Sequence, residues 1–142
     1  MKKEKSCGAV VYYLGSDGPL FLIEKMELGH YSLPKVHVEN NETEIETAHR
    51  EIKEETSLEL EINPSFRKTI TYSPGKDIIK DVVFFISETK SKEVKPQLCE
   101  VSSILFLPLD EALKKLTFQL DKDVLIAANE FLHKSIITDT NN

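Results

Sequence analysis

The stretch that decides the fold is residues 35–58, which read KVHVENNETEIETAHREIKEETSL. It crowds Glu51, Glu54 and Glu55 into one short segment, although the whole chain already carries a formal net charge of -6. On a helix, acids three or four residues apart repel each other by roughly a few tenths of a kcal/mol. Either an external cation offsets this repulsion, or the acids simply face water.

The same stretch carries the signals of a helix. Thr43 followed by Glu46 fits a capping box, so we expect the helix to begin at Thr43 and to end near Ser57. Its apolar positions are Ile45, Ala48 and Ile52. Their helical spacing predicts a stripe that faces a core.

On that helix the three glutamates fall within an arc of roughly 100° beside the apolar stripe, at the rim of the core. Arg50 stands four residues before Glu54, whereas Glu51 and Glu55 have no Lys or Arg three or four residues away. Carboxylate oxygens suit hard cations such as Mg²⁺ and Mn²⁺, which are typical of sites that act on phosphates. The pattern therefore leaves two interpretations open, a metal site and a solvated acidic face.

Length and composition predict a single domain, residues 1–142, with a core over about residues 5–136. A chain of 142 residues with 40% hydrophobic and 30% charged residues is typical of a globular protein. No stretch approaches the roughly 18 apolar residues that cross a bilayer. The acidic charge argues against a surface for polymeric nucleic acid. Cys7 and Cys99 show no metal or redox spacing, so we expect a reducing cytoplasm as the location.

Apolar, β-prone runs predict strands at residues 7–14, 20–25, 66–73, 81–87 and 103–107. The turn residues GSDGP predict that the first two strands form a hairpin, so the basic start leads into a strand rather than a signal peptide. Residues 27–41 lack a clear period and are expected to form a loop. Further helices are expected at about residues 110–116 and 121–135. This order predicts an α/β fold with a mixed sheet flanked by helices.

Residues 36–58 resemble the Nudix box. That motif reads Gly, five residues, Glu, seven residues, Arg-Glu, an aliphatic residue, any residue, Glu-Glu, any residue, Gly and an aliphatic residue. Its other fixed positions are met in register by Glu42, Arg50, Glu51, Ile52, Glu54, Glu55 and Leu58. Val36 and Ser57 replace the two glycines.

The flanking sequence is similar to the branch of this family that cleaves diadenosine tetraphosphate. YSLPKVHVE resembles the W-x-x-P-K-G-H-V-E of that branch, and SCGAVV, TYSPGKDIIKDVVFF and LCEVSSILFLPLDEA also look like it. The resemblance covers about residues 5–131. It implies an α/β/α sandwich that hydrolyses a nucleoside diphosphate linked to another group, with Mg²⁺ or Mn²⁺ bound.

The branch implies one substrate and leaves others open. Diadenosine tetraphosphate would be cut asymmetrically into ATP and AMP. The alternatives are a MutT-like enzyme for oxidised or ordinary nucleoside triphosphates, a nucleotide-sugar pyrophosphatase, and an enzyme for the 5′ end of RNA. The expected partner is therefore a small nucleotide, bound by a monomer or homodimer without a membrane.

The resemblance also implies metal ligands. Glu51 and Glu55 would be the principal ligands, and Glu54 would be a further one, directly or through water. The backbone carbonyl at Val36 would add another oxygen. Arg50 would orient the glutamates through salt bridges, and Glu42 would support the loop before the helix.

The resemblance also implies which residues take part in catalysis and which bind the substrate. Family members differ in which glutamate activates the water, and the candidates here are Glu54 and, outside the motif, Glu100. By itself Glu100 is an ordinary loop acid. The residues whose matched positions imply contact with the substrate are Lys35, His37 and Lys80 for phosphate and Tyr72 for the base. Without the resemblance, these four residues are explained equally well as solvated side chains at a strand edge.

The two replaced glycines raise different expectations. Ser57 can adopt a left-handed helix cap at a cost of about 1 kcal/mol. Val36 is β-branched and strongly disfavours positive φ, so either φ is negative there or the loop has shifted. A shifted loop would favour a rival function, a catalytically impaired Nudix fold that binds a nucleotide or protein. The retained glutamates and Arg50 favour the enzyme.

Overall fold

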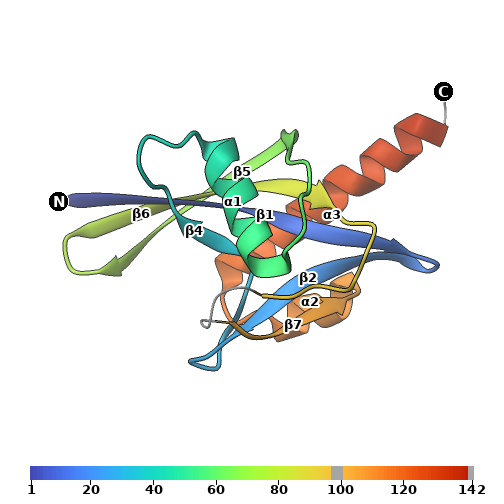
Figure 1. Ribbon diagram of the computed structural model, residues 1–142, viewed down its shortest axis with the longest axis horizontal. Helices are drawn as coiled ribbons and strands as arrows, with labels where there is room; N and C mark the ends of the chain where they lie inside the picture. The colour runs from blue at the N-terminus through green and yellow to red at the C-terminus, as the bar shows by residue number, and fades with distance from the viewer. Residues whose placement is uncertain (97–100, 141–142) are drawn as a thin grey trace.

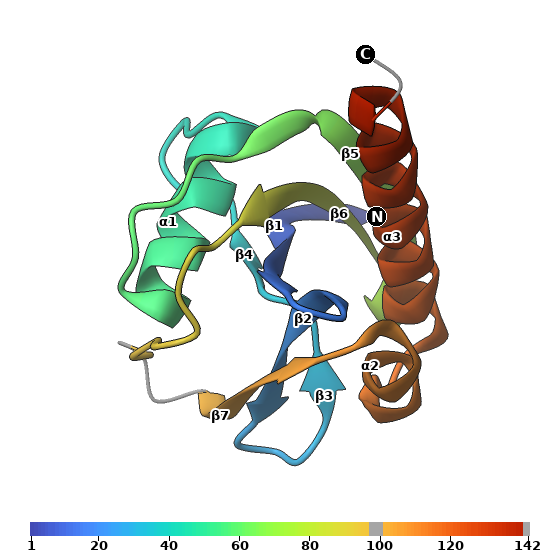
Figure 2. The same ribbon diagram turned by 90° about the vertical axis from the view of Figure 1, so that its right-hand side faces the viewer.

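The computed structural model describes residues 1–96 and 101–140. Within them, a seven-stranded sheet is covered by α1 (Glu44–Thr56) on one face and by α2 (Leu109–Lys115) and α3 (Gln119–Thr140) on the other (Figure 2). The strands are β1 (Lys2–Gly15), β2 (Gly18–Met26), β3 (Tyr31–Ser32), β4 (Lys35–His37), β5 (Asn63–Gly75), β6 (Ile78–Glu88) and β7 (Val101–Leu107). These layers, also visible in Figure 1, confirm the predicted α/β/α sandwich.

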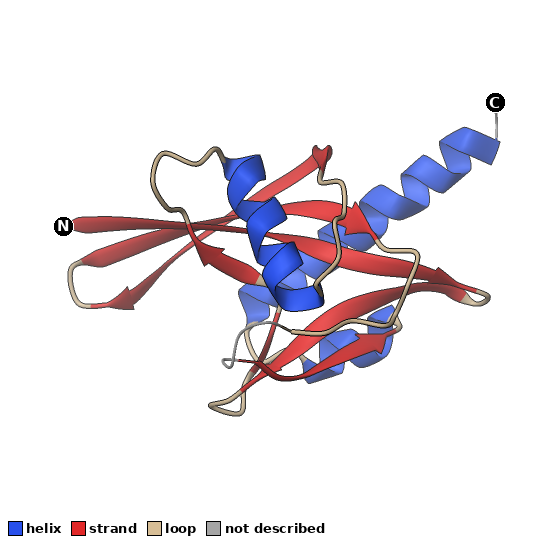
Figure 3. Cartoon of the chain, in the orientation of Figure 1, coloured by secondary structure: helices blue, strands red, loops and turns tan. Residues whose placement is uncertain are grey.

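The sheet is mixed, as expected (Figure 3). β1 and β2 pair antiparallel as far as Gly15 opposite Gly18, which confirms the predicted hairpin. β1 pairs in parallel with β6 along its other edge, and β6 pairs antiparallel with β5. β2 also pairs with β7. β1 and β2 therefore lie at the centre of the sheet.

Strand alternation decides which side chains enter which layer. On β2, Leu22 belongs to the core beneath α1, whereas Phe21 and Ile23 belong to the core beneath α2 and α3. Because successive side chains of a strand point to opposite faces, Glu24 shares the face of Leu22. An acid on a central strand is thereby directed toward α1.

Residues 27–41 differ from the predicted loop, because they contain the short strands β3 and β4. β4 pairs antiparallel with β1, with Lys35 opposite Gly8 and Val36 opposite Cys7. A strand of three residues is too short to show an alternating pattern, so only the tertiary pairing reveals it.

The predicted apolar stripe of α1 is wrong at its first residue. Ala48 and Ile52 are buried as expected, but Ile45 is 43% exposed. The buried face of α1 consists of Thr47, Ala48, Glu51, Ile52, Glu55 and Thr56. It therefore includes two of the acids that the sequence placed at the rim.

The two C-terminal helices begin close to where the sequence predicted them. α2 begins at Leu109 and α3 at Gln119, each within two residues of the expected start. α3 runs to Thr140, five residues beyond its expected end at residue 135. None of the helices in the described part of the chain has the length and apolar character that membrane crossing requires.

Candidate active site

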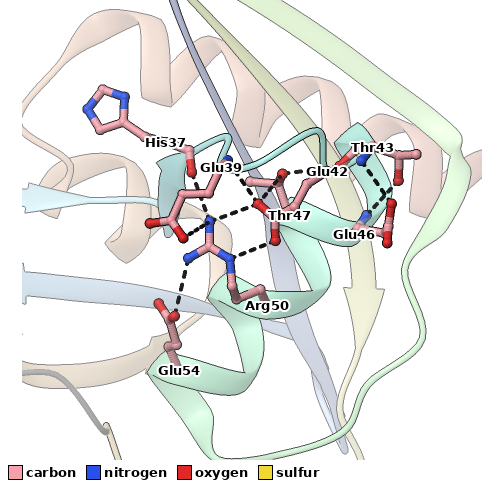
Figure 4. A network of polar contacts seen from close by, with 8 residues as sticks. All are labelled: His37, Glu39, Glu42, Thr43, Glu46, Thr47, Arg50 and Glu54. Atoms are coloured by element: carbon pink, nitrogen blue, oxygen red, sulfur yellow. Dashed lines mark hydrogen bonds and ion pairs between the residues drawn. The ribbon is translucent and has the colours of Figure 1, made fainter.

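The ends of α1 follow the sequence signals closely. The Glu46 amide donates to the Thr43 hydroxyl at 3.1 Å, and the Thr43 amide donates to Glu46 Oε1 at 2.9 Å, which confirms the capping box (Figure 4). At the other end Ser57 adopts the left-handed conformation, with φ 63°, and its amide donates to the Lys53 carbonyl at 2.8 Å. Serine thus supplies the cap that glycine supplies in the motif.

Arg50 joins α1 to the loop before it (Figure 4). Its guanidinium donates to Glu42 at 2.9 and 3.0 Å, to Glu54 at 3.2 Å and to the His37 carbonyl at 2.9 Å. The hydrogen bonds from Arg50 are the main reason that the pKa of Glu42 falls to about 2. The bidentate ion pair between Arg50 and Glu42 fixes the loop against the helix. The separate hydrogen bond from Arg50 to Glu54 holds the Glu54 side chain toward Arg50.

Three glutamate side chains meet between α1 and β2. Glu51 and Glu55 of α1 and Glu24 of β2 each offer a carboxylate oxygen, and these oxygens lie within 4.8 Å of one another. The three residues, which we call the carboxylate cluster, are 2%, 5% and 3% exposed, respectively. The interpretation of a solvated acidic face is therefore wrong for Glu51 and Glu55.

Burial makes the ionised carboxylate cluster costly without a counter-charge. Removal from water, together with the neighbouring carboxylates, raises the pKa of Glu24 to about 10 and that of Glu51 to about 9. Within the described residues, Glu24 Oε2 and Glu51 Oε1 have no hydrogen-bond partner. Either bound protons or a cation would remove the cost.

The spacing of the carboxylate cluster suits a small divalent cation. In an octahedral Mg²⁺ site the oxygens lie about 2.1 Å from the metal and therefore up to about 4.2 Å apart. The cluster oxygens, all within 4.8 Å of one another, need only small adjustments to reach this spacing. The donor set, three carboxylates without nitrogen or sulfur, is also the one that hard cations prefer.

The other predicted metal and catalytic residues are not members of the carboxylate cluster, or they lie outside the described residues. Glu54 is ion-paired to Arg50, and its side chain is 24% exposed. Val36 is part of β4. Glu100 lies outside the described residues, as does Cys99, so the predicted role of Glu100 stays a prediction.

Val36 replaces the first glycine of the motif without backbone strain. Among the described residues, the non-glycine residues with positive φ are Asn40, Asn41, Ser57 and Asp77. Val36 therefore has a negative φ, the first of the two expected alternatives. Its place opposite Cys7 in the sheet explains why a β-branched residue is accommodated there.

Two of the predicted substrate-binding residues line a pocket of about 300 Å³, which we call the aromatic pocket. Its lining residues are Lys35, Ile70, Tyr72, Phe118, Gln119, Leu120 and Asp121. The Lys35 ammonium lies 5.9 Å from the centre of the Tyr72 ring. A flat ring beside a cation suits a ligand with an aromatic base and a phosphate.

The other two predicted substrate-binding residues, Lys80 and His37, are not among the lining residues of the aromatic pocket. Lys80 on β6 is the cross-strand partner of Tyr72 on β5. Burial, with a smaller effect of Lys35, lowers the pKa of Lys80. The His37 side chain is exposed, while its carbonyl accepts the hydrogen bond from Arg50.

Sequence reasoning missed Glu24, although the chain carried a signal for it. In the predicted strand of residues 20–25, Glu24 directly follows the apolar run LFLI. Alternation along the strand assigns Glu24 to the same face as Leu22. What the sequence did not show was that α1 covers this face.

Comparisons with known proteins identify the family and agree with the fold. The family model described as NUDIX domain matches residues 5–128. The chain is 35% identical over 107 residues to an asymmetrical bis(5'-nucleosyl)-tetraphosphatase of Rattus norvegicus, an alignment that covers 72% of each protein. An Ap4A hydrolase of C. elegans, solved as a binary complex, has a TM-score of 0.84 and 25% identity, over 92% of this chain and 98% of that one. The NUDIX domain of Shewanella oneidensis NrtR, complexed with ADP ribose, shares the fold with a TM-score of 0.75 and 17% identity, over 93% of this chain and 90% of that one.

Proposed function

Because the chain belongs to the Nudix family and is a hydrolase of pyrophosphate bonds, we propose that it cleaves diadenosine tetraphosphate asymmetrically into ATP and AMP, with Mg²⁺ or Mn²⁺ bound. The observation that carries the proposal is the buried carboxylate cluster. Buried acids are costly unless a counter-charge joins them, and a divalent cation supplies one.

In this proposal Glu51 and Glu55 hold the cation, and the carbonyl at Val36 is a further candidate ligand. A bound divalent cation would polarise a phosphoryl oxygen, neutralise phosphate charge and favour the hydroxide form of water. The two glutamates are set on one face of α1 by their spacing of four residues. The helix thereby presents both carboxylates to the same point.

Arg50 and the acids around it then position the reacting groups. Arg50 holds Glu54 at 3.2 Å and fixes the preceding loop through Glu42. Because its side chain is partly exposed, Glu54 is within reach of water and is a candidate to accept its proton. Glu100 is the other candidate for this proton transfer.

The aromatic pocket would receive the nucleoside. Tyr72 would stack on the base, while Lys35, Lys80 and the exposed side chain of His37 would contact phosphate oxygens. The pairing of Tyr72 with Lys80 across β5 and β6 supports this division, since it sets a ring beside a cation on adjacent strands.

The test is product analysis with a panel of nucleotides. Diadenosine tetraphosphate, nucleoside triphosphates, nucleotide sugars and 5′-triphosphorylated RNA would each be incubated with Mg²⁺, with Mn²⁺ and with a chelator. We expect ATP plus AMP from diadenosine tetraphosphate only when metal is present. Faster release from another substrate would reassign the enzyme to that class, and no turnover by folded protein would favour the impaired binding module.

The substitution Val36→Gly tests whether valine restrains the metal-binding loop. Since Val36 lies in a strand with negative φ, glycine should lower the free energy of unfolding by about 1 kcal/mol without raising turnover. Urea denaturation and steady-state kinetics would measure the two effects. A several-fold rise in turnover would instead show that valine impairs catalysis.

Location and assembly remain predictions from the sequence. We expect the enzyme in a reducing cytoplasm, as a monomer or homodimer. Size-exclusion chromatography with light scattering would decide the second point.

A further inference from the structure

Glu24 lies in the same small space as the two glutamates of α1 but comes from a different part of the chain. It is 3% exposed on the central strand β2, on the face covered by α1. One of its carboxylate oxygens lies within 4.8 Å of an oxygen of Glu51 and of Glu55. Its Oε2 atom has no hydrogen-bond partner within the described residues.

In the part of the chain that the structure describes, no basic side chain is paired with Glu24. Among the described residues, no Lys or Arg forms an ion pair with it. Its neighbour Lys25 lies instead near the Tyr31 ring, 6.0 Å from the centre. Lys35 lowers the pKa of Glu24 only weakly compared with the effect of burial.

We propose that Glu24 is a third carboxylate ligand of the divalent cation held by Glu51 and Glu55, an inference that rests on the proposed function. The ligand it takes is a hard cation, Mg²⁺ or Mn²⁺, because the three donors are all carboxylate oxygens. Glu24 thus connects the sheet to α1 through the metal.

A buried carboxylate is costly unless a counter-charge joins it. The carboxylate oxygens of Glu24, Glu51 and Glu55 lie within 4.8 Å of one another, so one cation bound between them would supply that counter-charge to all three. Metal ligands bind in the deprotonated form. A purely structural role would need no acid here, because glutamine has the same shape and avoids the charge.

The test compares Glu24→Gln with wild type by direct metal binding. Mn²⁺ affinity would be measured by electron paramagnetic resonance, and Mg²⁺ binding by the rise in melting temperature. We expect the substitution to weaken Mn²⁺ binding roughly tenfold or more and to reduce the Mg²⁺-induced rise. The matched control is Glu27→Gln, an exposed acid three residues along the chain, which should bind metal like wild type.

A second variant covers failure of the first to fold. Glu24→Asp keeps the charge but shortens the reach, so it should also weaken Mn²⁺ binding. Wild-type affinity in every folded Glu24 variant would overturn the inference.

The results also separate this inference from the proposed function. Metal binding that depends on Glu24, in a protein that turns over no nucleotide, would support the ligand and reject the proposed reaction. Metal-dependent turnover by wild type, with metal affinity unchanged in Glu24→Gln, would support the reaction and reject the ligand.

Discussion

Replacing Glu55 with Gln is expected to abolish metal-dependent turnover and to leave the fold intact. Glu55 is 5% exposed, and it belongs to the carboxylate cluster with Glu24 and Glu51. Glutamine fills the same volume but offers a neutral oxygen, so the cation loses one unit of ligand charge. Because removing even an outer partner of a metal site costs about 10–100-fold, we expect a loss of at least about a hundredfold. Steady-state product release with saturating Mg²⁺ would measure it.

The same substitution separates a metal ligand from a residue that only supports the fold. Without metal, Glu55→Gln removes a charge that repels Glu51, so its melting temperature should equal or exceed that of wild type. Addition of Mg²⁺ should stabilise the variant less than wild type, since ligand binding to the native state stabilises it. The exposed Glu27→Gln serves again as the control. Wild-type turnover in Glu55→Gln would show that the metal ligands are assigned wrongly.

The sequence predicted most elements because their patterns are long and local. The capping box at Thr43 and Glu46 defined the start of α1, and turn residues defined the β1–β2 hairpin. The strand β4 was missed since its three residues form a strand only by pairing with β1. The exposure of Ile45 was missed because spacing shows which residues share a helix face, but not where the sheet beneath it ends.

The part of the candidate site that lies on α1 could be predicted from the sequence. Glu51 and Glu55 share a helix face by their spacing, and the resemblance then suggested a metal. Glu24 was not predicted, because its approach to them depends on how α1 packs across the sheet. The conformation of Val36 could not be chosen from the sequence either, since a negative φ follows from its pairing with Cys7. Long-range packing therefore decided what local patterns left open.

The substitution Gly8→Ala is expected to destabilise the sheet strongly. A Cβ atom at Gly8 would lie 1.8 Å from the Pro34 carbonyl oxygen and 2.9 Å from the Lys35 Cα atom. Both neighbours are backbone atoms, so no side chain can rotate away, and β1 and β4 must separate. Such overpacking costs about 3 kcal/mol or more. For a chain of this size this corresponds to a fall in melting temperature of about 10 °C, which calorimetry would measure.

A matched control distinguishes this steric conflict from the general effect of replacing glycine. Gly75 also lies in a strand, but a Cβ atom there would meet only the Ile78 Cδ1 atom, at an ordinary 3.7 Å. Gly75→Ala should therefore change the free energy of unfolding by about 0.5 kcal/mol or less. Equal stability of the two variants would show that β4 does not pack against Gly8. A lower stability of Gly8→Ala than of Gly75→Ala would show that β1 packs closely against β4 at Gly8. Because β4 carries Lys35 and the carbonyls at Val36 and His37, the positions of these groups then depend on that packing.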